Sequence, residues 1–120
     1  MNPQKVIISE DLGQSLTAAM AEIAYDRLFV LCDETTRRLC LPVVTGEGLR
    51  TTVITIPAGD THKTLESVSH VWQELQRGGA TRHSLLINLG GGMVTDLGGF
   101  AASTFKRGIH FINIPTTLLA

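Results

Sequence analysis

Residues 84–100 read SLLINLGGGMVTDLGGF, an apolar run that ends in three consecutive glycines. The run from Ser84 to Leu89 predicts a buried β-strand, and a helix is predicted from about Met93 to Thr104. Gly90–Gly92 therefore stand where a strand passes into a helix. Glycine allows a tight turn and a close approach of the backbone to a ligand, so this junction is the first candidate for a binding site.

Apolar, β-branched runs alternate with helical patterns along the rest of the chain, which is typical of parallel βαβ units. The expected fold is a Rossmann-like α/β domain, a parallel sheet with helices on both faces. The other expected strands are residues 5–9, residues 27–32, a segment ending near residue 56, and residues 109–114. The other expected helices are residues 10–24, residues 35–41, and a segment that ends before residues 78–79.

The helix before Gly78 and Gly79 has the clearest pattern. Asp60 or Thr61 is the expected cap at its start, and the glycine pair is expected to close it in a left-handed turn. One stripe of the helix is predicted to face the core: Leu65, Val68, Trp72 and Leu75.

The composition indicates one packed domain over residues 1–120, with 43% hydrophobic and 18% charged residues. A net charge of −1 argues against a nucleic-acid partner bound by bulk electrostatics. No apolar run approaches the roughly 20 residues of a membrane-spanning helix, and no signal peptide opens the chain. Cys32 and Cys40 form no CxxC motif, so we expect small core thiols in a reducing cytoplasm.

Ligands of open parallel sheets bind at the carboxyl ends of the strands, beside the starts of the following helices. Backbone N–H groups freed at Gly90–Gly92 suit a phosphate or pyrophosphate there. A tight turn without any ligand is the alternative, and the triplet is not the spaced GxGxxG motif. Asp96 can accept hydrogen bonds from a ribose or a nicotinamide, or it can complement its own helix. Gly98 and Gly99 are unfavourable within a helix, which indicates a functional reason or close packing against the sheet or a neighbouring element.

Three further polar positions have both a binding and a structural interpretation. Asp60 and Lys63 can hold a ribose hydroxyl and a phosphate or carboxamide, or they can be a cap and a solvated cation. Asp33, after the second strand, suits an adenosine ribose or caps a helix. Arg107 precedes the fifth strand and is either solvated or a forked phosphate ligand.

The sequence predicts no metal site and no catalytic residue within this segment. The four histidines show neither HxxxH nor HExxH spacing. No Ser-His-Asp or Cys-His arrangement is visible either.

Three stretches resemble the amino-terminal domain of the 3-dehydroquinate synthase family: VLCDETT (30–36), IPAGDTHKTLESV (56–68) and LINLGGGMVTDLGGFAASTFKRGIHFINIPTTLLA (86–120). The resemblance covers nearly the whole chain. It implies NAD on this domain, zinc or cobalt on a helical carboxyl-terminal domain, and a homodimer. It also implies conversion of the phosphosugar acid DAHP to 3-dehydroquinate, with NAD used and regenerated in each turnover.

The resemblance also implies roles for individual residues. Asp60 stands where the family usually has Glu, and Thr95 stands where many members have Gly, which stiffens the turn but leaves its backbone donors. Asp33 matches an acidic position on the adenosine ribose. Arg107 matches an arginine that reaches the neighbouring subunit's substrate phosphate. The implied NAD-binding residues are Asp33, Ala58, Gly59, Asp60, Thr61, His62, Lys63, Gly91, Gly92, Met93, Val94, Thr95, Asp96, Thr116 and Thr117.

Residues 115–120 begin a new element and the chain stops about one turn into it, so we expect the amino-terminal part of a longer protein. The family's metal ligands and most of its substrate lysines would lie beyond residue 120. The 120 residues alone are therefore expected to be inactive. The alternatives are another sugar-phosphate cyclase, a metal-dependent alcohol or glycerol dehydrogenase-like domain, and a non-catalytic nucleotide-binding or oligomerisation module. The stretch from Phe105 to Ala120 favours the synthase over the dehydrogenases.

Overall fold

The computed structural model describes residues 4–6, 23–39, 51–57 and 65–115. Its five strands form one sheet in the order β1-β5-β4-β2-β3, and all neighbouring strands are parallel. The expected parallel α/β fold is thus confirmed. The strands are β1 (Gln4–Val6), β2 (Leu28–Asp33), β3 (Thr52–Ile56), β4 (Leu85–Gly90) and β5 (His110–Pro115), and the helices are α2 (Glu34–Leu39), α4 (Leu65–Arg77) and α5 (Gly92–Thr104).

The predicted elements agree with these bounds to within a few residues where the structure describes them. β1 begins one residue before the expected 5–9, and α2 begins one residue before the expected 35–41. β2, β4 and β5 each extend one residue further than predicted, to Asp33, Gly90 and Pro115. The helix expected over residues 10–24 and the cap expected at Asp60 or Thr61 lie outside the described residues.

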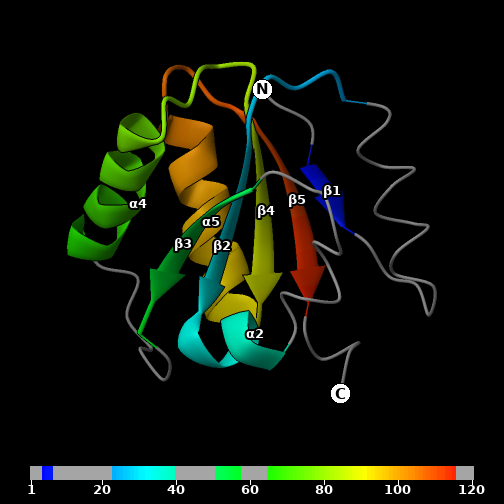
Figure 1. Cartoon of the computed structure of the whole chain (residues 1–120), viewed down its shortest axis with the longest axis vertical. Helices are drawn as coiled ribbons and strands as arrows, with labels where there is room; N and C mark the ends of the chain where they lie inside the picture. Colours follow the sequence, from blue (N-terminus) through cyan, green and yellow to red (C-terminus); the bar gives the residue numbers. More distant parts are fainter. Residues whose placement is uncertain (1–3, 7–22, 40–50, 58–64, 116–120) are drawn as a thin grey trace.

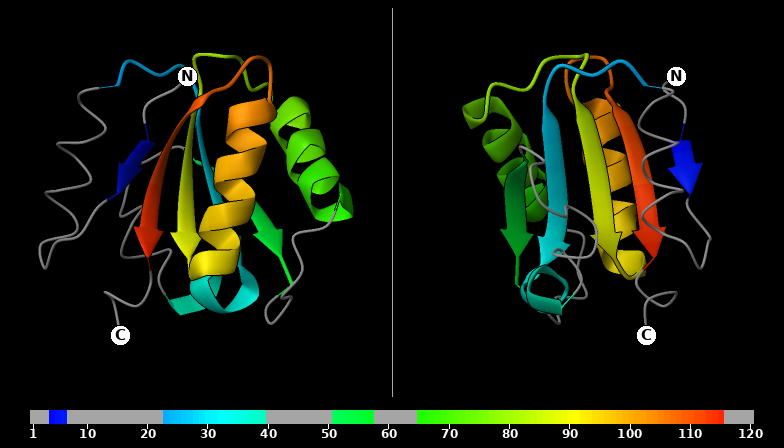
Figure 2. Two further views of the ribbon diagram at one scale, coloured as in Figure 1. Left: turned by 180° about the vertical axis from the view of Figure 1, so that it is seen from behind. Right: turned by 45° about the vertical axis from the view of Figure 1, so that its right-hand side comes forward.

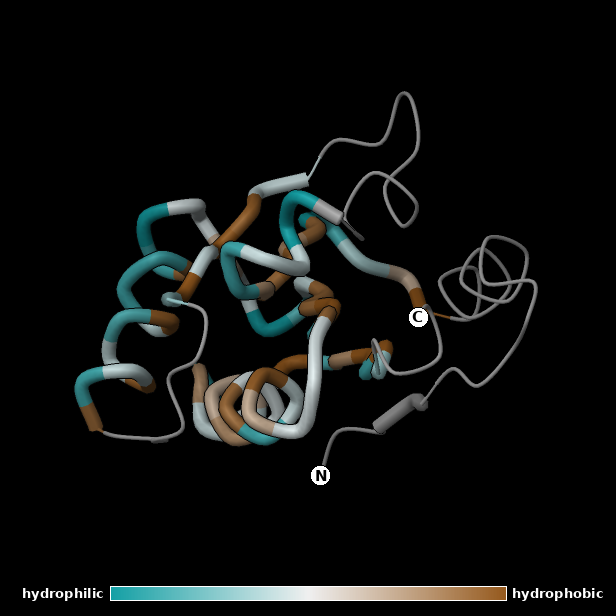
Figure 3. Tube along the Cα trace, turned by 90° about the horizontal axis from the view of Figure 1, so that it is seen from below, coloured by the Kyte–Doolittle hydropathy of each residue, from teal (hydrophilic) through white to brown (hydrophobic). Residues whose placement is uncertain are grey.

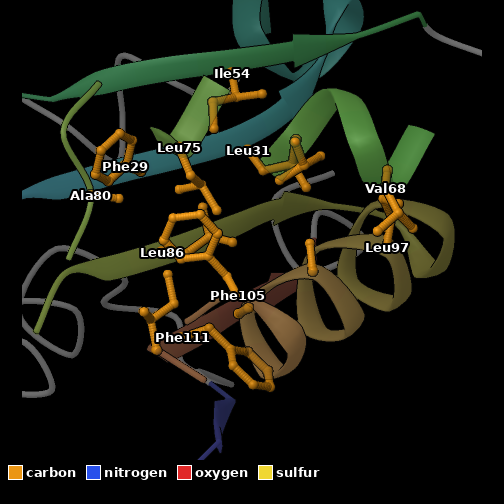
Figure 4. Packing of buried hydrophobic residues seen from close by; sticks show 14 of the residues in the cluster. Phe29, Leu31, Ile54, Val68, Leu75, Ala80, Leu86, Leu97, Phe105 and Phe111 are labelled. Carbon is orange, nitrogen blue, oxygen red and sulfur yellow. The ribbon is translucent and has the colours of Figure 1, made fainter. Parts of the chain in front are cut away.

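Helices α4 and α5 cover one face of the sheet (Figure 2). Phe29 and Leu31 of β2 and Leu86 of β4 are fully buried there against Leu75 of α4 and Leu97 of α5 (Figure 4). The hydrophilic residues of α4 lie on its outer side, away from the sheet (Figure 3). This apolar contact between helices and sheet is one of two hydrophobic cores.

The other face of the sheet has its own buried cluster. Val30 and Cys32 of β2 and Ile87 of β4 are fully buried, and Ile112 of β5 lies with them. Burial on both faces explains why these strands read as continuous apolar runs rather than as alternating ones.

One expected core position on α4 is wrong. Leu65 is 77% exposed, whereas Val68 and Leu75 are buried as predicted and Val71 is fully buried. Leu65 is the first residue of α4, and the helix diverges from α5 towards this end (Figure 1). The end of α4 is as predicted, because Gly79 adopts a left-handed φ of 80° just after Arg77.

Helix α5 lies very close to the sheet, as the glycine pair predicts. A Cβ added at Gly98 would be 1.8 Å from Oδ1 of Asn88, and one at Gly99 would be 3.5 Å from the Phe111 ring. Asn88 donates from Nδ2 to Oδ1 of its register partner Asn113 at 3.0 Å. Only a residue without a side chain fits over this buried amide pair.

Trp72 joins the two helices. It is half-buried against the core, and its Nε1 donates to the Ala101 carbonyl at 3.3 Å and to Oγ1 of Thr104 at 3.2 Å. The predicted core position of this side chain is thus confirmed, with a polar contact at its tip. None of the helices that the structure describes is both long and apolar enough to cross a bilayer.

Candidate functional site

The carboxyl ends of β2 and β4 lie side by side at the point where the strand order reverses. From β2 the chain continues to β3 on one side, and from β4 it continues to β5 on the other. Open α/β sheets bind ligands in the crevice at such a switch point. Asp33 ends β2 and Gly90 ends β4, so two of the predicted segments meet at this edge (Figure 1).

The three glycines at this edge have different roles. Gly90 is buried, and a Cβ there would lie 2.7 Å from Cβ of Val94, so this glycine permits close strand–helix packing. Gly91 and Gly92 are exposed, and a Cβ on either would meet no atom of the described residues within 4 Å. None of the three has a positive φ. The packing interpretation therefore holds for Gly90, whereas the open backbone needed for a ligand is found at Gly91 and Gly92.

No side chain among the described residues caps the amides in the first turn of α5. Gly91 is the N-cap residue and supplies no side-chain cap, so the N–H groups at the helix start have no acceptor from it. The Thr95 hydroxyl donates to the carbonyls of Gly91 and Gly92, at 3.3 and 3.1 Å. It therefore stiffens the turn and leaves the N–H donors available, as predicted. An uncapped helix start of this kind fits a phosphate or pyrophosphate.

Met93 and Val94, which follow in this turn, direct their side chains into the protein. Val94 is 1% exposed and Met93 packs against the same core. Only their backbone groups remain for the NAD contacts that the resemblance implies.

Asp33 caps α2, which was one of its two predicted interpretations. Its Oδ1 accepts from the Thr36 amide at 2.7 Å and from the Thr36 hydroxyl at 3.0 Å. No residue in the described part of the chain donates to its Oδ2. Within the described ranges, the cap occupies one carboxylate oxygen and no donor reaches the other, so the cap is compatible with the ligand interpretation.

Asp96 follows the first turn of α5 and is exposed. Its carboxylate forms no hydrogen bond or ion pair with any residue within the described ranges. The assignment of Asp96 to NAD stays a prediction.

Arg107 lies at the opposite edge of the sheet from the glycine turn (Figure 1). It belongs to a tight turn in which Lys106 and Arg107 have φ values of 44° and 70°, closed by the Gly108 amide donating to the Phe105 carbonyl at 2.6 Å. The structure thus does not bring Arg107 to the site of its own chain. A role at a neighbouring subunit's site stays a prediction.

The remaining predicted NAD-binding residues lie outside the described residues. In the sequence, they directly follow β3 and β5, two strands whose carboxyl ends lie at the same edge. They are Ala58, Gly59, Asp60, Thr61, His62, Lys63, Thr116 and Thr117.

Cys32 precedes Asp33 and is fully buried. Burial raises the pKa of its thiol to about 11, and the positive charge of Arg37 opposes this shift only partly. The thiol therefore stays protonated at neutral pH and cannot act as a nucleophile. Among the described residues, no three His, Cys, Asp or Glu side chains gather to hold a metal ion.

Sequence reasoning missed Thr36, the buried partner of Asp33. Its hydroxyl lies 3.2 Å from the carbonyl of Leu89 on the neighbouring strand β4. The Asp-x-x-Thr spacing after an apolar strand is the local signal that could have identified it, because such spacing is typical of a reciprocal helix cap.

Comparison with known proteins gives a consistent result. The family model described as 3-dehydroquinate synthase N-terminal matches residues 53–120. The 3-dehydroquinate synthase of Parabacteroides distasonis is 47% identical over 100% of this chain and 35% of its own length. The chain therefore spans about a third of that relative.

Solved structures show the same fold. A 2-deoxy-scyllo-inosose synthase complexed with carbaglucose-6-phosphate, NAD+ and Co2+ has a TM-score of 0.75 at 21% identity, over 94% of this chain and 31% of that one. A 2-epi-5-epi-valiolone synthase from Streptomyces hygroscopicus with NAD+ and Zn2+ bound has a TM-score of 0.73 at 25% identity, over 97% and 32%. With the family model and the sequence relative, these likenesses lead to one assignment: the chain belongs to the 3-dehydroquinate synthase N-terminal family.

Proposed function

We propose that this chain is the NAD-binding part of a cytoplasmic 3-dehydroquinate synthase, which converts DAHP to 3-dehydroquinate and phosphate in the shikimate pathway. The observation that carries the proposal is the open, uncapped turn at Gly91 and Gly92, beside Asp33 at the switch point of the sheet. Family membership and the NAD+ named in the two solved synthase structures support it.

The described residues fit a dinucleotide in charge and shape. Backbone N–H groups at the start of α5 would bind the pyrophosphate, because that end of the helix is positive and no described side chain caps it. The open oxygen of Asp33 would accept from a ribose hydroxyl. Asp96, one turn further, would accept from the other ribose or the carboxamide. NAD+, when bound, supplies a hydride acceptor that is restored before the product leaves.

The residues of this chain bind and orient rather than catalyse. In this proposal, zinc or cobalt, its ligands and most substrate contacts belong to the remainder of the enzyme. In the Parabacteroides relative, that remainder is about two thirds of the length. Arg107 would serve the substrate phosphate of a neighbouring subunit in a homodimer. This domain alone makes fewer contacts with NAD than the whole enzyme would, but the entropy lost when NAD is immobilised is the same. NAD binding by 120 residues is therefore expected to be weak.

Titration calorimetry with NAD tests the site. Gly92→Asp places a carboxylate where the pyrophosphate would lie, at a position where the helix dipole favours a negative side chain. We expect it to weaken NAD binding by about tenfold or more while the protein stays folded. Gln76→Glu adds the same charge on the exposed side of α4 and is the matched control.

Two results would count against the proposal. The first is no heat and no thermal stabilisation of the original chain at millimolar NAD, which favours a non-catalytic module. The second is equal NAD affinity in Gly92→Asp and Gln76→Glu. Phosphate release from DAHP by the 120 residues with NAD and zinc would separately refute the expectation that this part is inactive alone.

A further inference from the structure

Thr36 connects the ends of the two strands at the switch point, β2 and β4. It is 7% exposed and lies in the first turn of α2, directly after β2. Its hydroxyl lies 3.2 Å from the Leu89 carbonyl, one residue before the strand β4 ends at Gly90. The contact therefore connects the segment that contains Asp33 with the strand that leads into the glycine turn.

Thr36 also determines how Asp33 uses its carboxylate. The Thr36 amide donates to Oδ1 at 2.7 Å, and the Asp33 amide donates to the Thr36 hydroxyl at 3.0 Å. The single hydrogen of that hydroxyl is shared between Oδ1 of Asp33 at 3.0 Å and the Leu89 carbonyl at 3.2 Å. These reciprocal bonds leave the carboxylate few alternative rotamers. A carboxylate held in one orientation binds a diol better than a free one, because less side-chain entropy is lost on binding.

We propose that Thr36 is a positioning residue for NAD. It holds Asp33 with Oδ1 in the cap and Oδ2 left for the adenosine ribose, and it keeps α2 at a fixed distance from the strand that ends in the glycine turn. The inference rests on the proposed NAD binding. It further implies selectivity for NAD over NADP, since a fixed carboxylate at the ribose repels a 2′-phosphate.

The test compares Thr36→Val, which keeps the shape and removes the hydroxyl, with Thr36→Ser, which keeps the hydroxyl. Thr52→Val, an exposed threonine in β3, is the control for the substitution itself. We expect Thr36→Val to weaken NAD binding about tenfold, as for a lost hydrogen bond to a charged group. Thr36→Ser should bind within about twofold of the original chain.

A double-mutant cycle separates positioning from mere stability. If Thr36 acts through Asp33, then Thr36→Val should cost little further NAD affinity in an Asp33→Asn background. Thr36→Val should also lower the ratio of the NADP dissociation constant to the NAD dissociation constant. If Thr36 had a purely structural role, Thr36→Val would lower the thermal midpoint, its effect on NAD affinity would add to that of Asp33→Asn, and the ratio of the two dissociation constants would not change. That result would overturn the inference.

The outcomes are distinguishable from failure of the proposed function. If the original chain does not bind NAD, the proposed function fails; if it binds NAD and Thr36→Val binds equally well, only the role of Thr36 fails. Should Thr36→Val not fold, the amide resonance of Thr36 in the original chain provides the test. NAD should shift this resonance through Asp33, and an unmoved resonance at saturating NAD contradicts the inference.

Discussion

Polar groups at the two edges of the sheet differ in whether they have hydrogen-bond partners among the described residues. At the amino edge, where the strands begin, Asp26, Thr81 and Ser84 bond to one another. At the carboxyl edge, Gly91 and Gly92 leave helix amides uncapped, and Asp33 keeps one oxygen free of any described donor.

The amino-edge cluster, Asp26, Thr81 and Ser84, is held together by hydrogen bonds among its own members. Ser84 donates to Oδ1 of Asp26 at 2.8 Å, Thr81 donates to the other oxygen, and the Thr81 amide donates to the Ser84 hydroxyl at 3.0 Å. The hydrogen bond from the Thr81 hydroxyl is the main cause of the lowered pKa of Asp26. Burial opposes this shift, and the hydrogen bond from Ser84 lowers the pKa further. These bonds join the segments that enter β2 and β4.

This difference indicates where stability and binding reside. Polar groups that bond to one another contribute to the folded state, whereas groups without partners contribute nothing until a ligand supplies the partner. We therefore expect changes at the amino edge to alter the free energy of unfolding and changes at the carboxyl edge to alter NAD affinity.

The largest effect is expected for Gly98→Ala, because α5 connects the two edges. The new Cβ would lie 1.8 Å from Oδ1 of Asn88, a buried side chain that is bonded to Asn113. We expect a loss of about 3 kcal/mol in the free energy of unfolding, measured by urea titration, with weaker NAD binding as well. Gly99→Ala, which meets Phe111 at an ordinary 3.5 Å, is the adjacent control. Equal stability of the two variants would contradict the close packing of α5.

Asp26→Ala comes next and should affect stability alone. It removes the acceptor shared by Thr81 and Ser84, and we expect a loss of about 1 kcal/mol in the free energy of unfolding with NAD affinity unchanged.

Asp96→Ala is the counterpart at the carboxyl edge. Its free energy of unfolding should stay within about 0.5 kcal/mol of the original value, and its NAD binding should weaken. Urea titration and calorimetry on both variants measure the contrast, and the reverse pattern would refute the division between edges.

The lowered pKa of Asp26 predicts a dependence of stability on pH at the amino edge. A carboxyl whose pKa is lower in the folded state contributes stability above its unfolded value, here 3.8, and loses it as the pH falls through the folded value. The difference in unfolding free energy between the original chain and Asp26→Asn should therefore shrink between about pH 5 and pH 2. A constant difference across this range would show that the Thr81 and Ser84 bonds do not favour the ionised form.

The fold could be predicted because its signals are local. Continuous apolar runs located β2, β4 and β5 to within a residue or two, and Gly79 ended α4 in the left-handed conformation that its position predicted. Leu65 was assigned wrongly because periodicity records which side of a helix is apolar, not how far the helix stays in contact with the sheet.

The site could be predicted only in part, because its details depend on contacts between distant segments. Sequence alone located the glycine turn, but it could not distinguish Gly90, which is needed for Val94, from the open Gly91. The bond from Thr36 to Leu89 spans 53 residues, and the Asp26 cluster spans more than that. No local pattern reports which strands become neighbours.

The smallest change in stability is expected for Gly92→Ala, and it separates the edges most sharply. Alanine is the better helix former, and its methyl group would meet no described atom within 4 Å. We therefore expect the free energy of unfolding to stay the same or to rise by ~0.3 kcal/mol. The methyl group would nevertheless stand where the pyrophosphate approaches the backbone, so NAD affinity should fall severalfold. Gly90→Ala is the matched control, since its Cβ would meet Val94 and lower stability. Stability and affinity that fall together in Gly92→Ala would mean that this turn, like Gly90, serves packing alone.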